Sequence, residues 1–205
     1  MTSSLPLDPA SAVSSFDLEG SFIRLEPLTL AHLDGLCEVG MYAELWRWTT
    51  TSALSRDAMR SYVETALAWR AAGTAIPFAT VERNSGRVIG STRFANIDAT
   101  NRRLEIGWTW VAPPWQRSAA NTEAKLLMLT HAFETLQCLR VEFKTDALNE
   151  RSRNALRRIG ATEEGTLRKH IITESGRVRD SVYFSILDSE WPEVKLRLAQ
   201  RLQGA

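Results

Sequence analysis

The sequence is poor in cysteine and in long apolar runs, and it carries almost no net charge. Its two cysteines, Cys37 and Cys138, form no metal-like pair, and each stands among apolar residues, as thiols buried in a reducing compartment do. No apolar run approaches the length that spans a membrane. Acidic and basic residues are interspersed and sum to +1, so neither a nucleic-acid surface nor a polybasic membrane patch is indicated. We therefore expect a cytoplasmic protein that binds no metal, nucleic acid or membrane.

The first fifteen residues lack the charged and apolar segments of a signal peptide. They are rich in Ser and Ala, and we expect residues 1–15 to be a mobile tail. The chain of 205 residues is 44% hydrophobic and 24% charged, which is ordinary for a domain with a real core. Residues 16–205 are therefore expected to form a single domain.

A strand, a proline turn and a helix are predicted between residues 103 and 136. Over 103–111, large apolar residues alternate with other residues, which is typical of a half-buried strand. The apolar set is Leu104, Ile106, Trp108 and Trp110, and the opposite set is Glu105, Gly107 and Thr109. Pro113 and Pro114 then end the strand, because proline has no N–H to give to a sheet. Apolar residues recur at helical spacing at Leu126, Leu129, Phe133 and Leu136, so a helix begins near residues 119–122.

The start of this helix is a plausible phosphate site. A helix N-terminus presents unpaired backbone N–H groups, and the helix dipole favours negative charge there. Arg117 adds a cation, whereas Glu123 would oppose a phosphate unless its side chain points away. The structural alternative is an ordinary strand–turn–helix junction, which every α/β protein contains.

The remaining elements predict a mixed α/β or α+β domain with a largely antiparallel sheet. Strands are predicted at 22–26, 75–82, 87–94, 103–111, 140–145, 164–172 and 178–187, and helices after Thr29, Ser55 and Asn149 and over 189–202. Asn149 has two readings here: it either caps the helix that follows or contributes to a site together with Ser152.

Two motifs resemble those of the GNAT superfamily of acyl-CoA-dependent N-acetyltransferases, and of its RimJ/RimL-type branch in particular. The first, over 115–124, is similar to the family's pyrophosphate loop, Gln/Arg-x-x-Gly-x-Gly/Ala, with Gln116 at the first position. The second, Asn149-Glu150-Arg151-Ser152, is similar to its Asn-x-x-Ser signature. The resemblance covers about residues 20–190.

The resemblance implies a fold and a set of ligand contacts. The fold is a mostly antiparallel mixed sheet of about seven strands flanked by helices and splayed between the fourth and fifth strands. Acetyl-CoA is the co-substrate, its diphosphate is held by loop amides, and a backbone N–H near Trp110 or Val111 polarises the thioester. Asn149 binds the pantetheine arm, and Ser152 protonates the leaving thiolate. The implied loop residues are Gln116, Arg117, Ser118, Ala119, Ala120, Asn121 and Thr122.

The loop departs from the family pattern at Ala119 and Asn121, which stand where glycines are usual. Glycine permits positive φ and a close approach of the backbone to phosphate. Alanine adds one methyl group, and asparagine enters the left-handed region more easily than most residues. Because the N–H donors survive both changes, we expect coenzyme A to bind.

The general base is predicted only as a choice among three residues. Glu105 is the first candidate, because the alternation places it opposite the tryptophans. Asp180 is the second, as an inward-pointing acid on the strand of Val182, Phe184 and Ile186, and His170 is the third. The position that would carry a glutamate in some relatives is Ile171, and for each acid a structural ion pair is an equal alternative.

The acceptor is expected to be a primary amine, either a peptide or protein N-terminus or a small molecule. Trp46, Trp48, Trp108 and the run Arg168-Lys169-His170 are candidates to line its site, and the alternative for Trp46 and Trp48 is that they fill the core. A CoA-binding regulatory module without turnover and a transferase of another acyl group, such as succinyl, stay open. A homodimer is expected only because dimers are common among soluble proteins.

Overall fold

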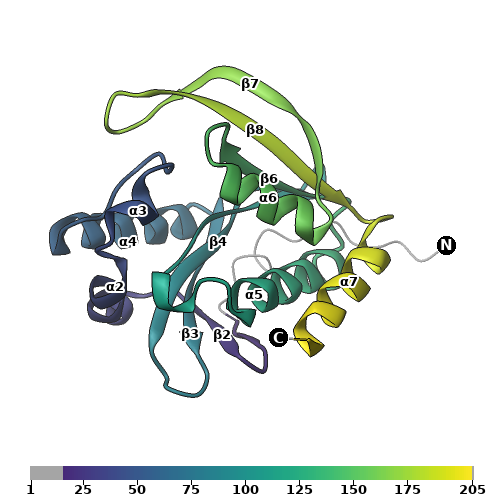
Figure 1. Ribbon diagram of the computed structural model, residues 1–205, viewed down its shortest axis with the longest axis horizontal. Helices are drawn as coiled ribbons and strands as arrows, with labels where there is room; N and C mark the ends of the chain where they lie inside the picture. The colour runs from purple at the N-terminus through teal and green to yellow at the C-terminus, as the bar shows by residue number, and fades with distance from the viewer. Residues whose placement is uncertain (1–15, 205) are drawn as a thin grey trace.

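The structure is a computed structural model, and it describes residues 16–204. The predicted mobile tail, residues 1–15, lies outside the described residues. Eight strands form one sheet: β1 (Leu18–Glu19), β2 (Ile23–Pro27), β3 (Ala75–Glu82), β4 (Val88–Asp98), β5 (Arg103–Val111), β6 (Arg140–Asp146), β7 (Thr162–Ile172) and β8 (Val178–Leu187). The helices are α2 (Leu33–Gly40), α3 (Ala43–Trp46), α4 (Arg56–Ala71), α5 (Ala119–Thr130), α6 (Glu150–Ile159) and α7 (Trp191–Gln203), with short η1 (Leu30–His32), η2 (Pro113–Trp115) and η3 (His131–Thr135) (Figure 1).

The strand order is β1-β2-β3-β4-β5-β6-β8-β7, and every neighbouring pair is antiparallel except β5 and β6. This confirms the mostly antiparallel mixed sheet flanked by helices. The eighth strand is the two-residue β1, which is too short to show a periodicity in the sequence. The bounds of β3, β5 and β8 are those predicted from the sequence.

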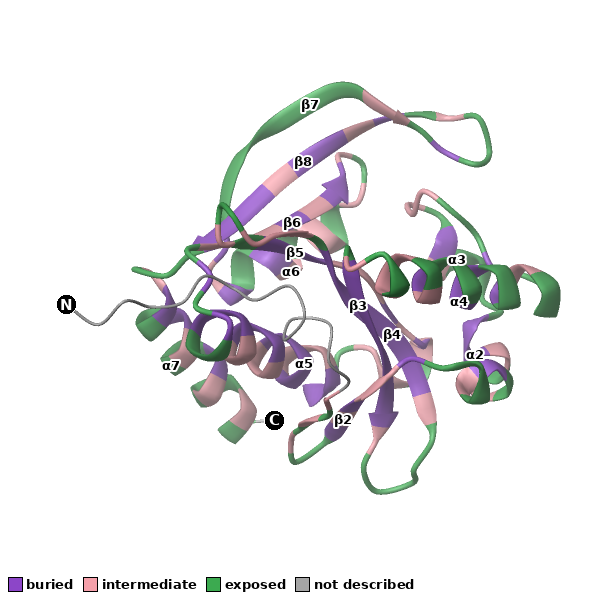
Figure 2. Cartoon of the chain, turned by 180° about the vertical axis from the view of Figure 1, so that it is seen from behind, coloured by how far each residue is buried: buried purple, intermediate pink, exposed green. Residues whose placement is uncertain are grey.

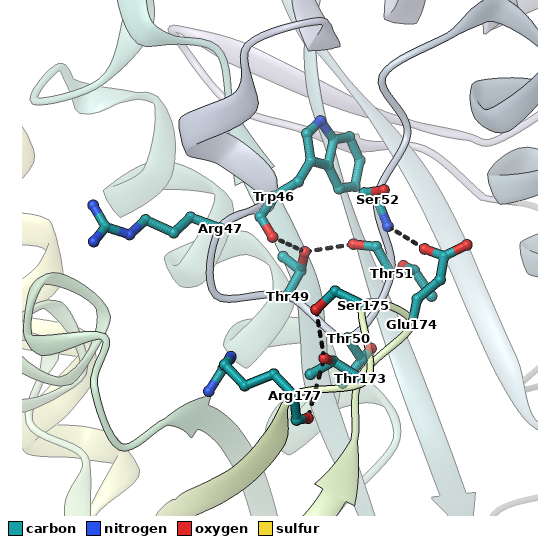
Figure 3. A pocket seen from close by; sticks show the side chains of 10 residues that line it. All are labelled: Trp46, Arg47, Thr49, Thr50, Thr51, Ser52, Thr173, Glu174, Ser175 and Arg177. Atoms are coloured by element: carbon teal, nitrogen blue, oxygen red, sulfur yellow. Dashed lines mark hydrogen bonds between the residues drawn. The ribbon is translucent and has the colours of Figure 1, made fainter.

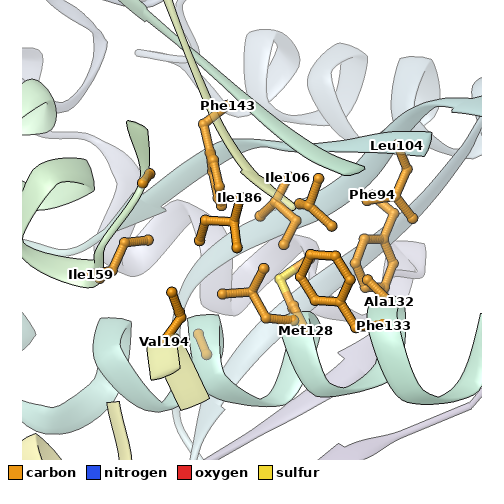
Figure 4. Packing of buried hydrophobic residues seen from close by; sticks show 14 of the residues in the cluster. Phe94, Leu104, Ile106, Met128, Ala132, Phe133, Phe143, Ile159, Ile186 and Val194 are labelled. Carbon is orange, nitrogen blue, oxygen red and sulfur yellow. The ribbon is translucent and has the colours of Figure 1, made fainter. Parts of the chain in front are cut away.

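Two apolar clusters lie on opposite faces of the sheet. One is built around α5 and α7 and includes Met128 and Phe133 against Phe94, Leu104 and Ile106 (Figure 4). The other joins α2 and α4 to the sheet and contains the side chains of Trp46 and Trp110. Figures 1 and 2 show α5 and α7 together on one side and α2 and α4 on the other. Strand β8 contributes Val182, Phe184 and Ile186 to the first cluster, whereas its hairpin partner β7 is exposed along most of its length (Figure 2).

The sheet separates between β5 and β6, as expected from the family resemblance. These strands pair only over Arg103–Glu105 and Arg140–Glu142, and beyond that point the ladder ends. We call the region where β5 after Glu105 and β6 after Glu142 no longer pair the strand split. A bulge in β5 accompanies it, because Ser91 pairs with Trp110 while Arg93 pairs with Gly107, and Trp108 has a φ of +49°.

The bulge makes one prediction wrong. Leu104 and Ile106 belong to the α5-side cluster, but Trp110 belongs to the α4-side cluster and Trp108 packs against it. One extra residue in a strand inverts the facing of all residues that follow it. Glu105, which alternates with Leu104 and Ile106, therefore shares the α4 face with the tryptophans instead of lying opposite them.

Candidate active site

The segment from Arg117 to Ala119 presents free backbone N–H groups at the start of α5. Ser118 is the N-cap, and its Oγ accepts from the N–H of Ala120 at 3.2 Å. Within the described residues, no partner accepts from the N–H groups of Arg117, Ser118 or Ala119. Arg117 is exposed and makes no ion pair in that part of the chain. An anion at this point would meet aligned amides, the positive end of a helix dipole and a guanidinium.

Replacing the family's glycines does not strain this loop. Ala119 and Asn121 both lie inside α5, where φ is negative, and the residue that adopts a positive φ is Arg117, at +63°. Neither position therefore requires glycine for its conformation. The methyl group of Ala119 affects only how closely a ligand approaches the amides.

Glu123 points away from the loop. Its carboxylate is buried and accepts three backbone N–H groups from the turn between β1 and β2, those of Ser21 at 2.7 Å, Phe22 at 2.8 Å and Ile23 at 2.8 Å. The sequence allowed a phosphate at this helix only if the side chain of Glu123 points away. That is the case here, because its carboxylate binds the turn between β1 and β2.

A pocket of about 410 Å³ adjoins the start of α5. Arg117, Ser118, Ala119, Ala120 and Thr122 form one wall, β2 and the β3–β4 hairpin another, and the end of α7 contributes Arg201. One carboxylate, that of Glu82, also lines the pocket and accepts from Trp115 Nε1 at 2.7 Å. Two guanidinium groups and a helix N-terminus thus outweigh one acid around this cavity, and this arrangement suits a polyanion such as a nucleotide diphosphate.

The second motif is brought next to the first. Asn149 caps α6, with its Oδ1 accepting the N–H of Ser152 at 3.0 Å, so the capping reading is correct. The cap uses only the oxygen of the side-chain amide. Gln116 joins the two motifs, because its Nε2 donates to the carbonyl of Val111 at 2.7 Å and its Oε1 accepts from Arg151 at 2.5 Å. The pyrophosphate-type loop and the first turn of α6 therefore meet at the end of the strand split.

Glu105 and Lys144 form an ion pair across the strand split on the α4 face. Lys144 Nζ lies 2.7 Å from Glu105 Oε2, which also accepts from Asn96 Nδ2 at 2.6 Å. Glu105 is 3% exposed. Burial lowers the pKa of Lys144, but the attraction of Glu105 outweighs burial and raises that pKa above its usual value. A buried carboxylate held at the split can act on a group that approaches from this face.

A second buried carboxylate, Asp146, ends β6. It pairs with Arg177, its Oδ2 lies 3.9 Å from Nε of Arg179, and its Oδ1 accepts the N–H of Leu148 at 2.9 Å. Arg179 is 7% exposed, and burial lowers the pKa of its guanidinium. The α4 side of the split therefore holds a dense network of paired charges.

Asp180 and His170 occupy less direct positions. Asp180 is only half-buried, and its Oδ1 accepts the N–H of Lys169 at 2.6 Å, where β7 bulges and Lys169 has a φ of +50°. The expectation of an inward-pointing acid is therefore wrong, because the β7 bulge draws the carboxylate to the neighbouring backbone. The ring of His170 lies 5.8 Å from that of Tyr183, which in turn lies 5.5 Å from Lys144 Nζ.

The candidate acceptor tryptophans separate into core and surface groups. Trp46 is buried, donates to the carbonyl of Gly40 at 2.8 Å and packs on Trp110. Trp48 is half-buried, with the guanidinium carbons of Arg47 and Arg177 at 4.8 Å and 5.4 Å from its ring. Trp108 packs edge-to-face on Trp69 with ring centroids 5.0 Å apart, and the fully buried Arg93 lies 5.1 Å from its ring.

A pocket of about 270 Å³ lies between the segment after α3 and the tip of the β7–β8 hairpin (Figure 3). Hydroxyl groups dominate its walls, together with Trp46, Arg47, Glu174 and Arg177. The hairpin tip is fastened to the opposite wall, because Glu174 donates its N–H to the carbonyl of Thr50 at 2.9 Å and accepts the N–H of Ser52 at 2.8 Å.

Residues 16–204 contain neither a membrane-spanning helix nor a cluster of metal ligands. None of the helices described there is both long and apolar enough to cross a lipid bilayer. The same residues contain no group of three or more His, Cys, Asp or Glu side chains placed to hold a metal ion.

Comparison with known proteins identifies the family. Residues 23–162 match the family described as Acetyltransferase (GNAT) domain, and the chain belongs to this family of acyltransferases. The solved GCN5-related N-acetyltransferase from Brucella melitensis is 29% identical, with a TM-score of 0.88, over 98% of this chain and 90% of that chain. GNAT acetyltransferases use acetyl-CoA and an amine acceptor.

Two curated relatives are also similar. "Putative ribosomal N-acetyltransferase YdaF" of Bacillus subtilis is 37% identical over 52% of this chain, and the alignment spans 57% of that protein's length. "Uncharacterized N-acetyltransferase p20" of Bacillus licheniformis is 29% identical over 82% of this chain and 94% of its own length. The first of these names agrees with the RimJ/RimL-type branch indicated by the motifs.

Three residues near the strand split escaped the sequence-based prediction, namely Lys125, Asp146 and Tyr183. Lys125 was detectable in principle, because it stands three and four residues before Met128 and Leu129, on the buried side of a helix, where lysine is rarely placed. Asp146 and Tyr183 gave no such indication, since an acid at a strand end and a tyrosine in a strand are both common.

Proposed function

We propose that this protein transfers an acetyl group from acetyl-CoA directly to a primary amine. The observation that carries the proposal is the set of unpaired N–H groups at the start of α5, beside Arg117 and the strand split. Amides suited to a diphosphate stand at the mouth of a gap between two strands, and a pantetheine arm needs such a gap to reach the opposite face of the sheet.

Each predicted donor-side residue has a role in this proposal. The amides from Arg117 to Thr122 hold the diphosphate, and a backbone N–H near Trp110 or Val111, which follow the β5 bulge, is aimed at the thioester oxygen. The free amide nitrogen of Asn149 binds the pantetheine arm, and the hydroxyl of Ser152 returns a proton to the departing thiolate. Gln116 keeps these two groups together through Val111 and Arg151.

Glu105 is the residue we assign as general base. It is buried at the strand split on the α4 face, and Trp108 shares that face. Asp180 is a weaker candidate, because its carboxylate is engaged by the backbone of β7. His170 and Trp48 lie toward the β7–β8 hairpin and are proposed to line the acceptor side with Trp46 and Trp108.

The acceptor is proposed to be the N-terminus of a peptide or protein. The support comes from the name of the Bacillus subtilis relative, a ribosomal N-acetyltransferase, together with the pocket between the α3 segment and the β7–β8 hairpin. A small-molecule amine is the alternative acceptor.

We further propose that residues 16–205 act as one acyl-CoA N-acyltransferase domain. The free cysteines agree with a cytoplasmic location, and a homodimer stays a proposal without structural support.

A CoA-binding module without turnover is the second candidate function. The observation in its favour is that Lys144 and Asn96 both engage Oε2 of Glu105, so among the described residues only Oε1 is left to receive a proton. A transferase of a larger acyl group, such as succinyl, is a variant of the first proposal and is distinguished by the donor that is consumed.

The test is thiol release from acetyl-CoA in the presence of a panel of peptides with free N-termini and small amines, alongside calorimetry with acetyl-CoA alone. Binding together with acceptor-dependent thiol release supports the transferase. Binding without release for every acceptor supports the module, release with succinyl-CoA alone supports the larger acyl group, and no binding of any acyl-CoA overturns all three.

A further inference from the structure

Lys125 is a buried ammonium group that the proposed reaction does not use. It lies near the middle of α5 and is 5% exposed. Its Nζ donates to Thr109 Oγ1 at 3.0 Å and lies 5.7 Å from the centre of the Phe143 ring. Thr109 belongs to β5 and Phe143 to β6, so the amine stands beneath the strand split on the α5 face.

The two strands contacted by Lys125 are unpaired at these positions. Pairing of β5 with β6 ends at Glu105 and Glu142, before either Thr109 or Phe143 is reached. Thr109 is also the residue that follows the bulge, since Trp108 has the positive φ. The amine therefore faces the stretch of β5 whose backbone N–H groups are assigned to the acyl donor.

The hydrogen bonds of Lys125 are incomplete. An ammonium group has three N–H donors, and among the described residues only Thr109 Oγ1 accepts one. Thr109 Oγ1 also lies 2.7 Å from Thr92 Oγ1, so the one acceptor of the lysine is shared with a second hydroxyl. Burying an ammonium group without a carboxylate partner is unfavourable. N–H donors of Lys125 that lack an acceptor in this buried place therefore indicate a ligand that supplies one.

Lys144 provides an internal comparison. It lies on the opposite face of the same split, where Glu105 at 2.7 Å compensates its charge and raises its pKa. No charged side chain of α5, β4, β5 or β6 compensates Lys125 among the described residues, and burial lowers its pKa to about 7. The protein thus supplies a carboxylate partner for Lys144, whereas Lys125 has none and is available to a ligand.

We propose that Lys125 binds the pantetheine–thioester arm of the acyl donor, using the N–H groups that the protein leaves free. This inference rests on the proposed function, because it requires the arm to enter the strand split. Lys125 is then a donor-binding residue that touches the arm from the α5 side, opposite to the acceptor and to Glu105. The arm carries carbonyl oxygens and a sulfur atom, and these accept the hydrogen bonds that Thr109 cannot.

The proposal predicts a proton uptake on binding. An acceptor placed against Lys125 favours the ammonium form and raises its pKa. In the free protein the amine is largely neutral above pH 7, so acetyl-CoA binding near pH 8 takes up as much as about one proton. Near pH 6 the amine is already charged, and the uptake disappears.

The experiment is calorimetry with two ligands, in buffers of different ionisation enthalpy. The ligands are acetyl-CoA and adenosine 3′-phosphate 5′-diphosphate, which has the nucleotide and the diphosphate of CoA but no arm. The variants are Lys125→Met, which keeps an unbranched side chain one atom shorter and without donors, and Lys195→Met as the control. Lys195 lies on α7, which carries neither edge of the strand split, and its partly exposed side chain pairs with Glu134.

We expect Lys125→Met to weaken acetyl-CoA binding about tenfold or more and to abolish the proton uptake, while the affinity for the nucleotide alone stays within about twofold. Lys195→Met changes none of these quantities. Unchanged acetyl-CoA affinity in Lys125→Met overturns the inference, and so does an equal loss for both ligands, which would mean that the lysine only supports the β5 bulge.

Two further results keep this inference separate from the proposed function. If the unmodified protein binds neither ligand, the proposed function fails and the inference falls with it. If it binds acetyl-CoA with no proton uptake near pH 8, the inference alone fails, and this measurement stands even if the Lys125→Met variant does not fold.

Discussion

The carboxylate of Glu123 decides whether the start of α5 can receive an anion. In the first turns of a helix an acid competes with phosphate for the same positive field. Here it serves the turn between β1 and β2 instead, and a Cβ on Gly20 would lie 2.3 Å from its carboxyl carbon, so only glycine allows this approach. The charge of Arg117 is thereby left unopposed for a ligand.

Replacing Glu105 with glutamine tests its role as general base. We expect Glu105→Gln to lower kcat by about a hundredfold or more with an amine acceptor, because general-base catalysis commonly contributes that much. The affinity for acetyl-CoA should stay unchanged, since Glu105 lies on the α4 face, away from the loop that begins α5. Steady-state kinetics and calorimetry on the same preparation measure both quantities.

The matching substitution Asp180→Asn separates the two acidic candidates. It weakens the hydrogen bond to the N–H of Lys169 and should change kcat by no more than a few-fold. A large loss in Asp180→Asn together with a normal rate in Glu105→Gln would reverse the assignment.

Strand β5 shows how far sequence periodicity reaches. Its bounds, 103–111, follow from the alternation of apolar residues, and the helix after it begins at Ala119, inside the predicted range of residues 119–122. The facing of Trp108 and Trp110 could not be predicted, because the bulge that inverts it depends on the register with β4. Periodicity therefore gives the extent of an element more reliably than the side on which each residue lies.

The same distinction holds for the candidate site. Asn149 and the N–H groups of residues 117–119 were predictable because capping and helix starts are local features of the chain. The ion pair of Glu105 with Lys144 and the hydrogen bond of Lys125 to Thr109 depend on contacts between β5, β6 and α5. No local pattern encodes the partner that a side chain finds across the sheet, so these two interactions could not be predicted.

The tip of the β7–β8 hairpin is expected to shape the acceptor site. Glu174→Ala removes the bond to the N–H of Ser52 but keeps the main-chain bond to Thr50. We expect the KM for a peptide acceptor to rise several-fold, with acetyl-CoA affinity unchanged, because the wall of the pocket loosens without affecting the loop before α5.

The control for the hairpin is Glu193→Ala, since Glu193 is exposed on α7 and pairs only with Arg197 one turn away in the described part of the chain. An acceptor KM that is equal in Glu174→Ala and Glu193→Ala would show that this hairpin tip has no part in acceptor binding.

At the scale of the whole molecule, two cores on opposite faces of one sheet hold the strand split apart. The α5-side cluster fixes Leu104 and Ile106 before the bulge, and the α4-side cluster fixes Trp110 after it. Because each half of β5 is anchored to a different core, β6 cannot follow the strand beyond Glu105. The gap is thus a consequence of packing on both faces of the sheet.

The buried amine beneath that gap makes the stability of the whole fold depend on pH. The pKa of Lys125 falls from 10.5 to about 7 on folding, so between these values the unfolded chain binds more protons than the folded protein. Burying the charged form of Lys125 destabilises the folded protein, and this cost is fully present below pH 7. The cost decreases as the pH rises, so the free energy of unfolding increases by about 1 kcal/mol per pH unit between pH 7.5 and 9. The folded pKa of the Cys138 thiol, about 11, acts in the opposite direction at higher pH.

Urea denaturation of the unmodified protein and of Lys125→Met isolates this effect, because every other group, Cys138 included, is common to both. The methionine variant should be the more stable of the two near pH 7, and its advantage should shrink by about 1 kcal/mol for each pH unit up to pH 9. A difference that stays constant over this range would mean that Lys125 is charged in the folded protein and that a partner compensates it. The free N–H groups assigned to the acyl donor would then not exist.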